Sequence, residues 1–129
     1  MKSVLTKSNG YLILSFELLG AGAAAVTAST GAAQILAASS AISRSGAGVF
    51  VITLAKSYNK LVEAAADVDD SLDDGAYATI GTVTNEGTST ALQFTLRFRN
   101  AGGTKADPAA ARRIWVQLVL REGTGSGES

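Results

Sequence analysis

The 129-residue sequence contains no cysteine and no histidine. Without cysteine, the chain can form no disulfide, thiol nucleophile, iron–sulfur cluster or thiolate zinc site. Without histidine, it lacks the commonest general base, metal ligand and pH switch. Asp, Glu, Lys, Tyr, Ser and Thr side chains remain for chemistry. We therefore expect a structural or binding protein that is not an enzyme and uses no cofactor.

Surplus charge and bulky side chains are also scarce. Eleven Lys and Arg residues balance eleven Asp and Glu residues, which gives a formal net charge of zero. Phosphate binding draws on surplus Lys and Arg, so the balance argues against nucleic acid as a partner and against a polybasic membrane anchor. Hydrophobic residues make up 47% of the chain but aromatic residues only 6%, so alanine supplies much of the apolar content. The length is that of one domain.

The N-terminal segment contains two patterns that imitate functional signals. Lysines followed by the apolar run Tyr11–Leu19 resemble a secretory signal, but the carboxylate of Glu17 inside that run argues against one. Gly20–Ala25 imitates the G-x-G-x-x-A fingerprint of dinucleotide sites. That fingerprint needs an acidic residue about 20 positions further on, and residues 25–43 contain none. We interpret Gly20–Ala25 as a connection between strands.

Apolar and polar residues alternate from residue 49 onwards, as in strands that bury one face. Thr90–Arg99 carries Gln, Thr and Arg on its second face. In Arg112–Arg121, Trp115 and Val119 make the second face half apolar, so we expect another sheet or a partner to cover it. The two main apolar faces consist of Leu92, Phe94, Leu96 and Phe98, and of Ile114, Val116, Leu118 and Leu120.

Further strand candidates are Val49–Leu54, Leu61–Val68 and Ala76–Val83. The alanines of Leu61–Val68 would also suit a helix. The turn Ser45–Gly48, which contains two glycines, and the turn Asn85–Gly87 connect neighbouring strands as hairpins. The pattern predicts an all-β protein: an antiparallel β-sandwich, jelly-roll-like, of six to eight strands, with an Ala/Gly/Ser-rich N-terminal stretch.

We expect this sandwich to be a single domain over residues 1–122, with an N-terminal arm or strand over about residues 1–40. The stretch 31–41 is compatible with a helix by propensity and also with a loop and a strand. Residues 123–129 have the Gly/Ser-rich composition of a flexible tail.

Aspartates cluster between positions 67 and 74. Asp67, Asp69 and Asp73 are the candidate cation ligands, because carboxylate oxygens bind calcium. The spacing fails the EF-hand pattern, since Leu72 stands where a loop starting at Asp67 needs glycine. Aspartate is common in turns, so we expect a solvated loop between two strands and no metal. A hydrolase using these carboxylates is the enzyme alternative, but no aromatic residues accompany them to line a cleft.

Arg97 and Arg99 project from the polar face of their predicted strand. Acidic residues such as Glu86 or Glu122 are their candidate partners in weak surface ion pairs. The alternative interpretation is that these arginines dock against an acidic neighbouring subunit.

A hairpin, a strand and a turn follow one another in Ser43–Leu54, Tyr58 and Leu61–Ala64. This segment resembles one in small structural proteins of tailed bacteriophages, where an Arg/Ser-x-Gly-x-Gly-Val-aromatic hairpin leads into a strand and a Tyr-x-x-Leu turn. The loop closing on Ala106–Ala110 and the strand Ile114–Arg121, which ends in Val-Leu-Arg, resemble the family's closing hairpin. The resemblance covers residues 39–122, and the Ala/Ser/Thr stretch 21–40 departs from the pattern.

The resemblance implies a virion component, made in the host cytoplasm, that acts as a capsid decoration (cement) protein. Such a protein binds the outside of a tailed-phage head and stabilises contacts between subunits of the major capsid protein. It also implies self-association, with a homotrimer expected at three-fold positions. The alternative is a phage tail or fibre component or a receptor (carbohydrate)-binding module. The candidate interface residues are Tyr11, Leu14, Phe16, Arg97, Arg99, Trp115 and Val119.

Overall fold

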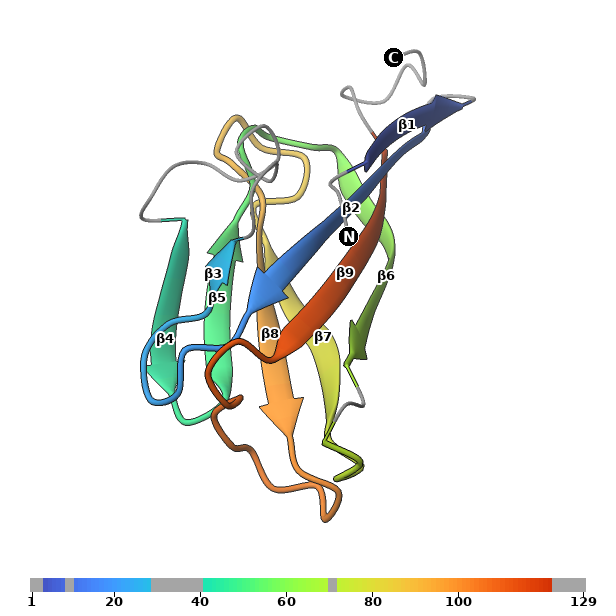
Figure 1. The fold of residues 1–129 in the computed structure, drawn as a ribbon. Helices are drawn as coiled ribbons and strands as arrows, with labels where there is room; N and C mark the ends of the chain where they lie inside the picture. Colours follow the sequence, from blue (N-terminus) through green and yellow to red (C-terminus); the bar gives the residue numbers. More distant parts are fainter. Residues whose placement is uncertain (1–3, 9–10, 29–40, 70–71, 122–129) are drawn as a thin grey trace.

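The computed structural model describes residues 4–8, 11–28, 41–69 and 72–121, and within these ranges it contains nine β-strands and no helix (Figure 1). The predicted all-β class is confirmed. None of the described residues belongs to a helix long and apolar enough to cross a membrane. The strands are β1 (Val4–Ser8), β2 (Tyr11–Leu19), β3 (Thr27–Ala28), β4 (Ile42–Gly46), β5 (Val49–Thr53), β6 (Lys60–Val68), β7 (Tyr77–Thr84), β8 (Gln93–Arg99) and β9 (Arg113–Arg121).

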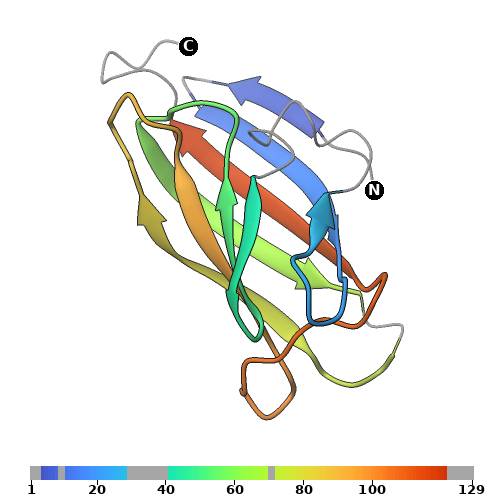
Figure 2. The same cartoon turned by 90° about the vertical axis from the view of Figure 1, so that its left-hand side faces the viewer.

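The strands form two antiparallel sheets that face each other (Figure 2). The first sheet has the order β1-β2-β9-β6, and β3 pairs with the end of β2 on the same edge as β1. The second has the order β4-β5-β8-β7. The predicted antiparallel sandwich is therefore confirmed. The strand number exceeds six to eight because the short β1 and β3 were not expected as strands.

The strand order does not confirm the jelly-roll arrangement. The second sheet consists of the hairpins β4-β5 and β7-β8, and β5 pairs with β8. Its order β4-β5-β8-β7 matches the ABED order of a constant-type immunoglobulin sandwich, with β4, β5, β8 and β7 in the places of strands A, B, E and D. The first sheet then has the CFG order if β6 and β9 are C and F and β2 stands in the place of the last strand, G. A strand from the beginning of the chain thus completes the sheet beside β9.

Alternation along the strands explains the core. The predicted apolar faces of β8 and β9 both point between the sheets and are buried. β2 does the same: it pairs with β9 along its whole length, and its even-numbered residues are buried. Leu14 and Phe16, expected at an interface, are 1% and 0% exposed and pack in the hydrophobic core. The largest buried side chains include Phe16, Phe50, Phe94, Leu12, Leu14, Leu18, Ile52 and Leu96.

The expected connections are also found. Residues 61–68 lie in the strand β6 and are not helical. Gly48 in the β4-β5 hairpin has φ +69° and Gly87 in the β7-β8 connection has φ +70°, a conformation that glycine adopts without steric cost. Residues 11–19 form an inner strand of the first sheet and not an arm. The alternative structures of 31–41 concern residues that, except for Ala41, lie outside the described ranges, as does the tail 123–129.

Candidate functional site: loop clamps and an outer sheet face

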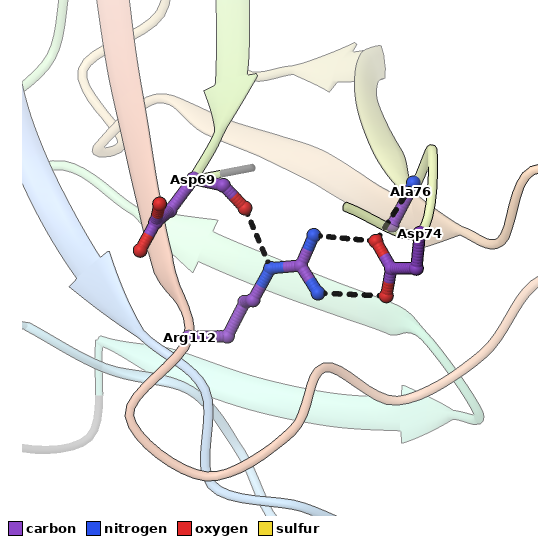
Figure 3. A network of polar contacts seen from close by, with 4 residues as sticks. All are labelled: Asp69, Asp74, Ala76 and Arg112. Carbon is purple, nitrogen blue, oxygen red and sulfur yellow. Dashed lines mark hydrogen bonds and ion pairs between the residues drawn. The ribbon is translucent and has the colours of Figure 1, made fainter. Parts of the chain in front are cut away.

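The cation held by the acidic loop is an arginine. Arg112, just before β9, is 5% exposed. Its Nη1 and Nη2 donate to the two carboxylate oxygens of Asp74 at 2.9 and 2.8 Å, and its Nε donates to the backbone oxygen of Asp69 at 2.9 Å (Figure 3). The guanidinium also lies 5.8 Å from the centroid of the Phe98 ring. A bidentate, partly buried pair of this kind fixes the loop between β6 and β7 against β9.

This arrangement holds the pKa of Asp74 well below its usual range. The main cause is the pair of hydrogen bonds from Arg112, which favour the ionised carboxylate, and the backbone N–H of Ala76 adds a further one at 3.2 Å. The carboxylate of Asp74 therefore stays ionised and paired with Arg112 well into acidic solution.

The three candidate cation ligands do not converge. Asp67 is exposed on β6, Asp69 lies at the end of that strand with its backbone oxygen bound to Arg112, and Asp73 is exposed in the loop with φ +49°. Among the described residues, no three acidic side chains are grouped to hold a metal ion. The described part of this loop forms an ion pair within the chain, between Asp74 and Arg112.

A second clamp joins Arg44 of β4 to Asp107. Arg44 Nε and Nη2 donate to the two carboxylate oxygens at 3.0 and 2.7 Å, and the backbone N–H of Gly48 donates to the same carboxylate at 2.9 Å. The hydrogen bonds from Arg44, followed by that from Gly48, lower the pKa of Asp107. Two residues 63 positions apart in the sequence thus connect the β4-β5 hairpin to the long β8-β9 connection.

The β2-β3, β4-β5, β6-β7 and β8-β9 connections lie at the same end of the sandwich (Figure 1). Both clamps join residues in or next to these connections. Gly20 exchanges backbone hydrogen bonds of 2.8 Å with the β8-β9 connection, donating to Arg112 and accepting from Ala111. A Cβ atom at Gly20 would clash with the backbone oxygen of Ala109. Gly20–Ala25 is therefore a strand connection that needs glycine for a close approach between backbones, as expected, and its glycine pattern has a packing reason.

The two candidate arginines of β8 lie on the outer face of the second sheet. Arg97 Nη2 donates to Thr82 Oγ1 at 2.9 Å, and Arg99 Nη1 donates to the backbone oxygen of Gly103 at 3.1 Å. The expected pairing with Glu86 is wrong, because the Glu86 carboxylate accepts a 2.7 Å hydrogen bond from the backbone N–H of Leu61. Glu122, the other candidate partner, lies outside the described residues.

The remaining candidates share the outer face of the first sheet, formed by β2, β9 and β6. Trp115 and Val119 are half-buried there, as the alternation along β9 predicts. Tyr11 lies directly opposite Arg121, whose Nη2 donates to the tyrosine hydroxyl at 2.9 Å and whose guanidinium is 5.1 Å from the ring centroid. The interface candidates thus divide between the two outer faces and the core.

Trp115 lies on β9, the strand between β2 and β6. Its cross-strand neighbours are Glu17 on β2 and Asp67 on β6. Glu17 is 7% exposed, and its Oε2 lies 3.8 Å from Nε of Arg113. The indole Nε1 of Trp115 is buried and finds no hydrogen-bond acceptor among the described residues. Buried N–H groups normally have a partner, so this donor is an exception within the described part of the chain.

A hollow of about 180 Å³ lies beside the indole ring, lined by Ala65, Asp67, Trp115, Val116 and Gln117. Alternation in the sequence places Gln117 on the same face as Trp115. It does not place Ala65 and Asp67 there, because that requires the register between β6 and β9. This combination of residues therefore depends on strand pairing and cannot be recognised from the sequence alone.

Searches against protein-family models, curated proteins and solved structures each found no match to this chain.

Proposed function

We propose that the protein is a non-enzymatic structural protein of a tailed-phage virion, which binds the outside of the head as a decoration protein and associates as a homotrimer. The observation that carries the proposal is the outer face of the first sheet, where Tyr11 on β2 and Trp115 and Val119 on the neighbouring strand β9 lie in half-buried positions.

A face of this kind suits contact with another protein. Aromatic residues are enriched at protein interfaces, and this face presents both Trp115 and Tyr11. The connections between the strands are also fixed to one another. The pairs Arg112–Asp74 and Arg44–Asp107 and the backbone hydrogen bonds of Gly20 join them, which makes this end of the sandwich rigid. A rigid sandwich can bind a capsid surface without ordering large segments on binding, which lowers the entropic cost of association.

Light scattering and cosedimentation test this proposal together. We expect the purified protein to have the mass of a trimer and to pellet with purified tailed-phage heads. A charge placed on the proposed contact face, in Val119→Asp, should abolish the association and the pelleting. Thr79→Asp, at an exposed position on the opposite face, is the matched control and should retain both. A protein that is strictly monomeric and never pellets with heads contradicts the proposal.

A further inference from the structure

The hollow beside Trp115 exists because the neighbouring strand carries small side chains there. On β6, Ala65 pairs with Gln117 and Asp67 pairs with Trp115, and β6 lies directly beside β9 in the sheet (Figure 1). A methyl group at Ala65 cannot fill the space beside a bulky indole ring. The side chains of Ala65, Asp67 and Gln117 are exposed, so the hollow is accessible from solvent.

The charge of the hollow comes from Asp67. Within the described part of the chain, no ion pair or hydrogen bond joins its carboxylate to another residue. The two arginines at the start of β9 lie against other acids: Arg112 binds Asp74, and Arg113 lies 3.8 Å from Glu17. The hollow therefore combines an aromatic ring with a carboxylate whose charge the described residues do not balance.

An arginine side chain has the matching chemistry. Its planar guanidinium stacks on aromatic faces and donates forked hydrogen bonds to carboxylates, and tryptophan is the aromatic residue that binds cations best. The chain already uses this combination once, because Arg112 lies over Phe98 while it binds Asp74. Arg121 shows a related contact without a carboxylate: it lies over the Tyr11 ring and donates to the tyrosine hydroxyl.

On the basis of the function proposed above, we propose that the hollow receives an arginine side chain of a partner virion protein. The guanidinium stacks on the exposed part of the Trp115 ring and donates to the carboxylate of Asp67. The side-chain oxygen of Gln117 accepts a further N–H. This contact neutralises Asp67 at the interface, which matters because an unpaired charge is costly to cover.

The single tryptophan gives one indole N–H signal, so NMR titration reports directly on the hollow. The probe is Nα-acetyl-arginine amide. Nα-acetyl-citrulline amide keeps its shape without the charge, and methyl glucoside represents a neutral sugar. We expect a saturable shift with the arginine probe and a much smaller one with citrulline. Asp67→Asn should weaken arginine binding about fivefold, the upper end for a solvent-exposed ion pair.

Asp73→Asn is the matched control, because it makes the same change at an exposed aspartate away from the hollow lining. It should leave arginine binding unchanged, and circular dichroism melting should show both variants folded. Equal shifts with the arginine and citrulline probes, or unaltered arginine binding in Asp67→Asn, would overturn the proposal. A shift produced by methyl glucoside alone would also overturn it and would assign the hollow to carbohydrate.

Cosedimentation with heads separates this proposal from the decoration function. If Asp67→Asn loses arginine binding but pellets with heads as well as Asp73→Asn does, the hollow is not the capsid contact and the decoration function stands. In the opposite outcome, Asp67→Asn loses arginine binding and Asp73→Asn keeps it, but neither the variants nor the unchanged protein pellets with heads. The arginine site then stands, and its assignment to a virion partner is overturned.

Discussion

Arg112 and Asp74 meet through two parallel hydrogen bonds of 2.9 and 2.8 Å, although the arginine side chain is 3% exposed and the aspartate side chain 46%. The carboxylate thus covers the end of a buried guanidinium that also binds the backbone of Asp69. Removing either partner would leave the other without its matching charge, and the cost falls mainly on the buried arginine.

Arg112→Lys should lower the melting temperature, because an ammonium group cannot make the forked contact and reach Asp69 as well. Calorimetry or circular dichroism measures the change. Asp73→Asn, in the same loop, is the control and should leave the melting temperature within about 2 °C, as most surface substitutions do. Equal melting temperatures for the two variants would mean that the clamp does not stabilise the fold.

Stability should fall in acid. The pKa values of Asp74 and Asp107 are lowered in the folded state, so the unfolded chain binds more protons as the pH drops through the ordinary aspartate range. Their contribution is therefore fully present above about pH 5 and is lost progressively below about pH 4. Urea unfolding at a series of pH values measures it. In Asp74→Asn/Asp107→Asn the free energy of unfolding should depend less on pH, and an unchanged slope would contradict this origin.

Gly48→Ala should destabilise the protein by about 2 kcal/mol or more, because left-handed backbone costs a residue with a Cβ roughly 1–2 kcal/mol before any clash. Here φ is +69°, and the added Cβ would lie 2.5 Å from the backbone oxygen of Ala106 and 2.6 Å from that of Phe98. Gly46→Ala in the same hairpin meets nothing within 4 Å and should be nearly neutral. Chemical denaturation compares the two, and similar losses would contradict the steric account.

Phe16→Ala should lower the free energy of unfolding by about 3–5 kcal/mol, as for other large aromatic residues removed from a core. The side chain is 0% exposed, so the loss should be the same at every protein concentration. Val62→Ala, at a residue that is 47% exposed, should change stability by less than about 0.5 kcal/mol. A Phe16→Ala effect that appears only where the protein associates would place this residue at an interface instead.

The fold class could be predicted because alternation is a local property. One face of β8 and one face of β9 were identified residue by residue, since each strand carries its own pattern of burial. The same alternation runs through Tyr11–Leu19, and its even-numbered residues are buried. Assigning Leu14 and Phe16 to an interface was wrong because the position of β2 in its sheet depends on pairing with β9, which no local pattern specifies.

The contacts of the candidate site depend on the same missing information. Arg112 and Asp74 are 38 positions apart, and Arg44 and Asp107 are 63 apart. Aspartates in a turn could be recognised, but not which arginine would bind one of them. Likewise, the alternation along β9 is enough to predict that Trp115 points away from the core. Its proximity to Asp67 depends on the register of β6 against β9, which the sequence does not reveal.

The placement of β2 beside β9 also determines the order in which the protein can fold. Tyr11 pairs with Arg121, 110 positions away, so β2 leaves the ribosome long before the strand it pairs with. The β4-β5 and β7-β8 hairpins can form while synthesis continues, but the first sheet cannot close until β9 has emerged. Contacts this distant in sequence slow folding. The apolar face of β2 therefore stays exposed until β9 has emerged, and aggregation is a risk during that interval.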